Sequence, residues 1–221
     1  MAGHFQEFED EYLETLYEFH ESAPFAQVRT GDIADRLGVS PASVSEMIQR
    51  LASKGFVEHE PYKGVTLTEL GLSHGQQMKR RHRLAEVLLD LLPFEGDAHA
   101  TACRLEHAID DDLEVALSTL IGDLRFDPSG RPIPPAHPDL SSRIKQSHGI
   151  ERLCDIKLQG KYTIRMMIFP FDILESFSEV GLRIGAEVSF HDQSIVLQNG
   201  HHLNMDDEWH SKIWVEPMNQ R

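Results

Sequence analysis

The sequence predicts a mainly α-helical N-terminal part followed by a small β-rich domain. In the first part of the chain, apolar residues recur at the spacings of three and four that are typical of helices. Beyond about residue 142, short strand-like runs alternate with turns that contain glycine and aspartate. Between these parts lies DPSGRPIPPAHPDL (residues 127–140), in which five prolines interrupt helices and sheet ladders alike. We therefore expect an irregular linker there and a domain boundary after residue 141.

A first helix is expected over residues 5–20, where large apolar side chains lie on one helical face. These side chains are Phe5, Phe8, Tyr12, Leu16 and Phe19. Longer helical patterns follow at residues 71–92, 99–109 and 112–121, and the first of these carries a basic patch at residues 79–83. In the last third of the chain, strands are expected over residues 161–169, 186–191, 194–198 and 212–215.

Two shorter helices are expected between residues 31 and 54. Thr30 and Ser40 suit the N-cap positions, and Pro41 suits the first position of the second helix. Gly38 and Gly55 can end the two helices. Strands at residues 56–59 and 65–68 would then complete the layout of a winged helix-turn-helix, whose second helix enters the major groove of DNA.

The candidate DNA-binding residues follow from this layout. Small or polar side chains at the start of the second helix allow close approach to base edges, and basic side chains can contact phosphates. The candidates for the bases are Ser40, Pro41, Ala42, Ser43, Ser45 and Glu46, and those for the phosphates are Arg50, Lys54 and Lys63. The alternative is an ordinary helical hairpin inside a core.

Composition and charge limit the classes of protein that remain. The 221 residues exceed one typical domain and contain no apolar run long enough to span a membrane. Two cysteines cannot form a disulfide framework, so we expect a cytoplasmic protein. The net charge of −15 argues against nucleic acid as a partner, but residues 1–27 carry −7, residues 28–83 carry +3 and residues 84–221 carry −11. The segment that contains the helix-turn-helix is therefore the one positive part of the chain.

Potential metal ligands form stripes on three of the expected helices. His99, Cys103, Glu106 and His107 lie at i, i+4, i+7 and i+8, on one helical face. His82 and Glu86 form an i, i+4 pair, and the first helix adds Glu7, Glu11, Glu14 and Glu18. Imidazole, carboxylate and one sulfur suit Fe(II), Mn(II), Co(II) or Ni(II). Solvated acidic faces, a buried apolar cysteine and a surface salt bridge are the alternatives for the separate residues.

These residues carry a family likeness. The chain resembles the diphtheria toxin repressor family of metal-dependent transcriptional regulators, which has iron-dependent and manganese-dependent branches. The matching segments are DEYLETLYEF (10–19), IADRLGVSPASVSEMIQRLASKGFVEHE (33–60), VTLTELG (65–71), RRHRLAEVLL (80–89), ACRLEHAI (102–109), SGRPIP (129–134) and VGLRIGAEVSF (180–190). The resemblance implies a winged helix-turn-helix domain over residues 1–71, a helical metal-binding and dimerisation domain over 72–141 and an SH3-like β domain over 142–221.

The resemblance also implies roles for single residues. Cys103, Glu106 and His107 match the family's primary metal site, to which Glu11 corresponds on the N-terminal helix. His82, Glu86 and His99 match the ancillary site, and His82 and Glu14 match ligands of the manganese-type arrangement. In the C-terminal domain, Pro170 and Ile173 stand where the iron-type pattern has ligands, so the nearby Asp172 and Glu175 are the candidates there.

The function that follows is a metal-dependent transcriptional repressor, not an enzyme, that binds a palindromic operator in double-stranded DNA as a homodimer. Sulfur from Cys103 favours Fe(II), with Mn(II) next, because Glu11 and Glu14 lean toward manganese. Neither a membrane nor a small organic substrate is expected as a partner. The rivals are a metal-dependent hydrolase or an iron-handling protein without a DNA role, and a regulator that senses an organic ligand. The sequence contains no HExxH and no CxxC, which speaks against a zincin protease and a structural zinc finger.

Overall fold

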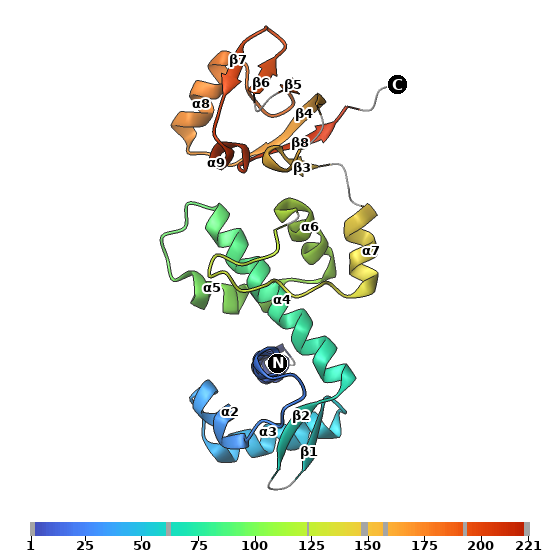
Figure 1. Ribbon diagram of the computed structural model, residues 1–221. Coiled ribbons are helices and arrows are strands. Elements are labelled where there is room, and N and C mark those ends of the chain that lie inside the picture. Colours follow the sequence, from blue (N-terminus) through green and yellow to red (C-terminus); the bar gives the residue numbers. More distant parts are fainter. Residues whose placement is uncertain are drawn as a thin grey trace.

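The computed structural model describes residues 3–60, 63–122, 124–146, 150–156, 159–191 and 194–218. Three layers follow one another along the molecule (Figure 1). A winged-helix unit forms one end, a helical layer forms the middle, and a β-rich domain forms the other end. The long helix α4 (Glu69–Leu91) leaves the winged-helix unit and runs through the helical layer.

The winged-helix unit has the predicted order of elements. It consists of α1 (Gly3–Ser22), α2 (Thr30–Leu37), α3 (Pro41–Ser53), β1 (Val57–Glu60) and β2 (Gly64–Leu67), and the two strands pair antiparallel. The side chain of Ser40 caps α3 by accepting a hydrogen bond from the Ser43 amide, as predicted. The N-cap prediction for Thr30 is wrong. The Arg29 carbonyl already accepts the first helical bond, from the Ile33 amide, so α2 begins at Thr30 itself.

A buried carboxylate ties the first helix of this unit to the third. Glu9 on α1 is fully buried and pairs with Arg50 Nε at 2.5 Å and with Lys54 Nζ at 2.6 Å, both near the end of α3. The apolar core of the unit lies beneath this pair and contains Leu13, Leu16, Ile33, Val44, Ile48 and Leu51. Movement of α1 must therefore carry α3 with it.

The helical layer is built around α4. It contains α5 (Ala98–Leu105), the 3₁₀ turn η1 (Glu106–Ala108), α6 (Asp111–Ile121) and α7 (Pro138–Gln146). Helices α1 and α4 cross closely at Gly75, where an added Cβ would lie 2.5 Å from the Leu13 carbonyl oxygen. Only glycine permits this approach, which brings one face of α1 against the middle of α4.

The proline-rich segment is irregular, as predicted, but it is packed rather than loose. It crosses α4, where Arg80 Nη1 donates a 2.8 Å hydrogen bond to the Pro134 carbonyl and Arg83 donates one to the Pro132 carbonyl. Its last residues begin α7, which packs on α6. The expected domain boundary after residue 141 therefore falls inside a helix of the middle layer.

The predicted basic patch at residues 79–83 does not form a positive surface. Lys79 pairs with Glu14 and Glu18, and the guanidinium of Arg83 pairs with Glu21. Arg80 and Arg81 share the fully buried carboxylate of Glu114. Acidic helices flank α4 on both sides, so these cations neutralise charges inside the molecule.

The C-terminal domain is built on a six-stranded antiparallel sheet with the order β3-β8-β4-β5-β6-β7. The strands are β3 (Glu151–Arg152), β4 (Gly160–Met167), β5 (Glu187–His191), β6 (Ser194–Leu197), β7 (His202–Asn204) and β8 (Ile213–Pro217). The predicted strands correspond to β4, β5, β6 and β8. Three short helical elements of this domain were not predicted from the sequence; they are η2 (Leu153–Asp155), α8 (Phe171–Val180) and α9 (Asp207–His210).

Trp214 joins this domain to the helical layer. Its side chain on β8 is fully buried, and its indole Nε1 donates a hydrogen bond to the Leu120 carbonyl at the end of α6. The contact is both apolar and directional, so it fixes how the sheet sits on the helices.

Replacing Trp214 with alanine should lower the free energy of unfolding by about 3–5 kcal/mol, because a large buried side chain leaves a cavity. Trp214→Phe keeps most of the apolar contact and loses the hydrogen bond, so it should cost about 1 kcal/mol. Urea unfolding followed by far-UV circular dichroism measures both. A Trp214→Phe variant as stable as the wild type would contradict the role of the indole N–H.

Candidate metal centre

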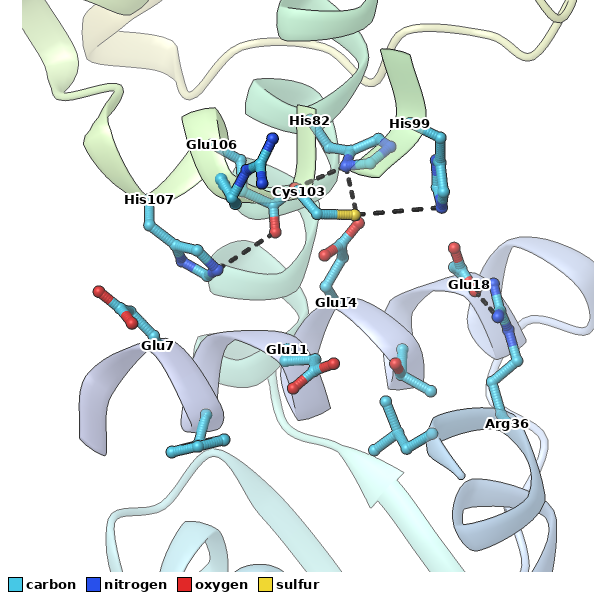
Figure 2. A pocket seen from close by; sticks show the side chains of 14 residues that line it. Glu7, Glu11, Glu14, Glu18, Arg36, His82, His99, Cys103, Glu106 and His107 are labelled. Carbon is cyan, nitrogen blue, oxygen red and sulfur yellow. Dashed lines mark hydrogen bonds and ion pairs between the residues drawn. The ribbon is translucent and has the colours of Figure 1, made fainter. Parts of the chain in front are cut away.

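A cavity of about 490 Å³ lies between α1 on one side and α4, α5 and η1 on the other. Seven of the eight predicted metal ligands line it; these are Glu11, Glu14, His82, His99, Cys103, Glu106 and His107. In Figure 2 the carboxylates of α1 lie across the cavity from the imidazole and thiol groups. The eighth, Glu86, does not line the cavity but contacts His82 and His99. The helical stripes predicted from the sequence thus face one another.

His82 is the centre of this arrangement. It is 1% exposed, and its Nδ1 lies 2.6 Å from Glu106 Oε2 and 3.9 Å from Glu14 Oε1. Its Nε2 lies 3.2 Å from Glu86 but makes no hydrogen bond. Two groups of three ligand atoms, each within 4.8 Å of one another, share this residue; they are His82, His99 and Cys103, and Glu14, His82 and Glu106.

The donor set fits a divalent first-row metal. Each group combines imidazole with carboxylate or thiolate, which are the ligands that Fe(II) and Mn(II) use in proteins. Two buried imidazole nitrogen atoms, Nε2 of His82 and Nδ1 of His107, make no hydrogen bond. Burying them is costly in a site that holds no ion and costs less in one that does.

Protonation offsets part of the negative charge of the metal-free site. Burial alone would lower the pKa of His82, but its polar contacts with Cys103, Glu106 and Glu86 outweigh it and raise the pKa to about 11. Burial, together with the nearby charge of Glu14, raises the pKa of Glu106 to about 7 against the opposing effect of His82. At neutral pH the metal-free protein therefore holds an imidazolium where several carboxylates converge.

Glu86 is held from two sides. Its Oε1 lies 3.2 Å from Nδ1 of His99, and its Oε2 accepts a 2.5 Å bond from Arg131 of the proline-rich segment. Burial would raise the pKa of Glu86, but His82 and His99 hold it well below its usual range. The guanidinium of Arg131 is itself fixed by Asp127, whose buried carboxylate lies 2.6 Å from Nε. The proline-rich segment thus orients one predicted ligand.

His107 lies at the other end of the cavity. Its Nε2 is 3.5 Å from Glu106 and its Nδ1 is 3.6 Å from Asp10, a buried carboxylate that also binds His74 at 2.7 Å. The close contact with the Asp10 carboxylate is the main reason that the pKa of His107 is raised. Asp10 comes from α1, so His107 already contacts the first helix without a metal.

The acidic face of α1 is only partly open to a cation. Glu7 and Glu11 are exposed at the mouth of the cavity. Glu14 is buried and lies 3.0 Å from Nζ of Lys79, while Glu18 pairs with both Lys79 and Arg36. Burial would lower the pKa of Lys79, but Glu14 and Glu18 raise it, so Lys79 stays a cation.

The predicted C-terminal candidates are not brought to this site. Asp172 and Glu175 are exposed on α8 in the β-rich layer, and neither lines the cavity. The helical layer separates α8 from α1 in Figure 1. In the arrangement seen here, no described residue of the C-terminal domain lines the cavity.

Three residues at the centre were missed by the sequence analysis as part of the site. Asp10 lies three residues after Glu7 and four before Glu14, at the edge of the same helical face, but it was not singled out among the acidic residues of the first helix. Lys79 was assigned to a basic surface, and Arg131 lies in a segment without regular structure. No periodic pattern marks Lys79 or Arg131, because they reach the site from the middle of α4 and from the proline-rich segment.

The start of α3 presents the predicted DNA-binding residues to solvent. Ser40, Pro41, Ala42, Ser43, Ser45 and Glu46 are all exposed. Lys63 is exposed in the wing and pairs with Glu60 at 2.6 Å. Arg50 and Lys54 both pair with the buried carboxylate of Glu9. Part of their positive charge is therefore neutralised within the protein, so they are less available to a phosphate than the sequence suggested.

Comparisons with known proteins agree with this geometry. Residues 4–65 match the family model for the iron dependent repressor, N-terminal DNA binding domain, and residues 68–135 match that for its metal binding and dimerisation domain. The diphtheria toxin repressor of Corynebacterium efficiens is 31% identical over 220 residues, which cover 93% of each chain. The chain belongs to the iron-dependent repressor family. The predicted family is confirmed, and with it the prediction that the protein is a DNA-binding repressor and not an enzyme.

Other relatives agree with this family. The iron-dependent repressor IdeR of Mycobacterium tuberculosis is 35% identical over 126 residues, which cover 56% of this chain and 54% of IdeR. The solved structure of the metal-dependent transcriptional regulator MtsR covers 95% of this chain and 98% of its own, with a TM-score of 0.51 and 22% identity. It supports the predicted fold class, helical N-terminal domains and a small β domain.

As a member of the iron-dependent repressor family, the chain has DNA, a second copy of itself and a divalent metal as its partners. The DNA-binding family model accounts for the winged helix, which the hydrolase and iron-handling alternatives left unexplained. No helix in the described ranges has the length and apolar character to cross a membrane.

Metal binding to this repressor should tighten as pH rises between about 7.5 and 9. The pKa of His82 near 11 means that its proton persists across this window and must leave when a metal takes the nitrogen. Release of one proton corresponds to an apparent affinity that rises up to about tenfold per pH unit. Mn(II) titration against a fluorescent chelator under anaerobic conditions measures this slope, and His82→Gln should flatten it. A wild-type affinity that does not change with pH would contradict the assignment.

Proposed function

We propose that a divalent metal in the cavity between α1 and the α4–α5–η1 group switches this repressor into its DNA-binding state. The observation that carries the proposal is the origin of the ligands. Glu11 and Glu14 belong to the winged-helix unit, whereas His82, Cys103 and Glu106 belong to the helical layer. A site shared between two units fixes their relative position when it closes.

The residues of the chain would divide the work as follows. Glu14, His82 and Glu106 form one group, and His82, His99 and Cys103 form the other, with Glu11 and His107 at the edge and Glu86 orienting His82 and His99. A bound divalent metal supplies positive charge and a cross-link between helices. The carboxylates of α1 then cease to repel Glu106, and the His82 proton is no longer needed. The population shifts toward the arrangement that binds DNA only as far as the metal prefers it.

We propose Fe(II) as the first choice of metal and Mn(II) as the second. Cys103 is half-buried and lies 4.0 Å from Nε2 of His99, so a soft thiolate is available beside an imidazole, a combination that favours Fe(II). Glu11 and Glu14 add hard oxygen ligands, which pull toward Mn(II).

The DNA-bound form that we propose is a homodimer on a palindromic operator. Two copies of α3 would enter successive major grooves, with Ser40 to Glu46 at the base edges and Lys63 and Arg50 near the phosphates. An apolar dimer seam that includes Leu92 is compatible with its 44% exposure. Leu84, Val87 and Ile109, by contrast, are buried within the chain and belong to its core.

Chelation should weaken the binding of a selected operator duplex by about 100-fold, the upper range of typical coupling between two sites. The operator is selected from a random duplex pool by Mn(II)-loaded protein, and fluorescence anisotropy gives the affinity with Fe(II), Mn(II), Co(II), Ni(II) or chelator. Glu106→Gln should abolish the metal response because it removes a buried ligand and an anion together. Cys154→Ala, which removes the exposed cysteine of the C-terminal domain, is the matched control and should bind like the wild type. Equal affinity with metal and with chelator would refute metal gating.

Cys103→Glu should reverse the order of preference from Fe(II) to Mn(II). The change replaces the soft thiolate with a hard carboxylate at the same place and leaves the other ligands alone. Anaerobic competition for each metal gives the ratio of the two dissociation constants, which should move by about tenfold or more. An unchanged ranking would show that the thiolate does not set selectivity.

A further inference from the structure

Lys79 occupies an unexpected place for a lysine. It lies on α4 one turn before His82, its side chain is 2% exposed, and it points into the α1–α4 contact. Buried lysines are rare unless they are paired, and this one is paired twice, with Glu14 and with Glu18. The packing of α1 on α4 therefore holds this cation beside the proposed metal ligands, inside the protein and away from the surface.

Lys79 and His82 approach the same oxygen of Glu14. Oε1 of Glu14 lies 3.0 Å from Nζ of Lys79 and 3.9 Å from Nδ1 of His82. Glu14 is also one of the three residues whose ligand atoms cluster with His82 and Glu106. A metal ion that takes this oxygen must share it with an ammonium group or displace it, and the two cations repel one another at such distances.

Glu18 provides a place for the displaced ammonium. It already pairs with Lys79 and also with Arg36 on α2, where the distance is 2.7 Å. Lys79 can therefore leave Glu14 without becoming an unpaired buried charge, which would cost several kcal/mol. The exchange stays possible, but it is opposed.

We propose that Lys79 is an internal competitor for Glu14 that raises the free metal concentration at which the repressor loads. The proposal rests on the metal centre proposed above and adds a residue that tunes its sensitivity. In the metal-free state Lys79 takes the role of the cation at Glu14 and keeps α1 packed on α4. The metal must compete with this ammonium for Glu14. Lys79 therefore raises the metal concentration needed for loading and does not itself act as a ligand.

The test compares Mn(II) affinities of charge variants by competition with a fluorescent chelator at fixed pH. Lys79→Met keeps the length and apolar stem and removes the charge, and it should tighten Mn(II) binding by about tenfold or more, as for an ionisable group that loses a neighbouring charge. Lys79→Arg keeps the cation and should stay within about twofold of the wild type. Arg81→Met is the matched control, because this cation of the same helix pairs with Asp111 and Glu114 and should leave the affinity unchanged.

The double variant Lys79→Met/Glu18→Gln separates competition for Glu14 from a general field effect. It removes one positive and one negative charge, so a field effect alone predicts wild-type affinity, whereas direct competition predicts binding that stays about tenfold tighter. The double variant also leaves fewer unpaired buried charges, so it serves if Lys79→Met does not fold. The operator-binding midpoint should move to a correspondingly lower Mn(II) concentration.

The outcomes distinguish the two proposals. Wild-type protein that does not bind Mn(II) at this site refutes the metal centre itself. Wild-type protein that binds Mn(II), together with a double variant of equal affinity, leaves the metal centre intact and overturns the role of Lys79. A tighter double variant with an unchanged Arg81→Met supports internal competition.

Discussion

The junction of α1 and α4 buries more carboxylates than a folded protein tolerates without cations. Glu14 of α1 and Glu106 of η1 converge on His82 of α4, and α1 approaches α4 closely at Gly75. Two positive groups of the protein itself, the His82 imidazolium and the Lys79 ammonium, offset these negative charges. These positive groups are single charges, and a divalent ion at the same point attracts the carboxylates more strongly than either of them.

The charge distribution has the same logic on the scale of the molecule. A net charge of −15 is poor for binding DNA, and the positive segment around the helix-turn-helix loses much of its apparent surplus inside the structure. Arg80, Arg81 and Arg83 neutralise acidic neighbours, and Arg50 and Lys54 share Glu9. The surface that remains for DNA is modestly charged and small in its side chains at the start of α3. Sequence recognition by such a surface depends on contacts of α3 with base edges, because phosphate contacts position a protein on DNA without reading the sequence.

Sequence periodicity was enough to find the ligand stripes, because residues spaced by three or four must share a helical face. It also gave the helix-turn-helix, where Ser40, Pro41 and Gly38 mark the ends of the helices. Periodicity does not say which face meets which. Lys79 therefore looked like part of a basic patch, although α1 covers it. Asp172 and Glu175 were candidates only because they lie near Pro170 and Ile173, which stand where the family pattern has ligands. Arg131 reaches Glu86 from a proline-rich segment that has no period, and only the folded chain shows that this segment crosses α4.

The two ends of α1 explain how events at the cavity can reach the DNA-binding surface. Glu9 holds the last turn of α3 through Arg50 and Lys54, and Glu18 holds α2 through Arg36. The contact of Glu9 leaves the opposite face of α1 free to meet α4 and η1, where Asp10 and Glu14 contact His107, His82 and Lys79. Glu18 lies on this second face and contacts Lys79 as well as Arg36. The helix is thus attached to the winged-helix unit by one face and to the metal centre by the other. A restraint on the inner face becomes a restraint on the position of α3, because the ion pairs on the outer face and the core beneath them move as one body.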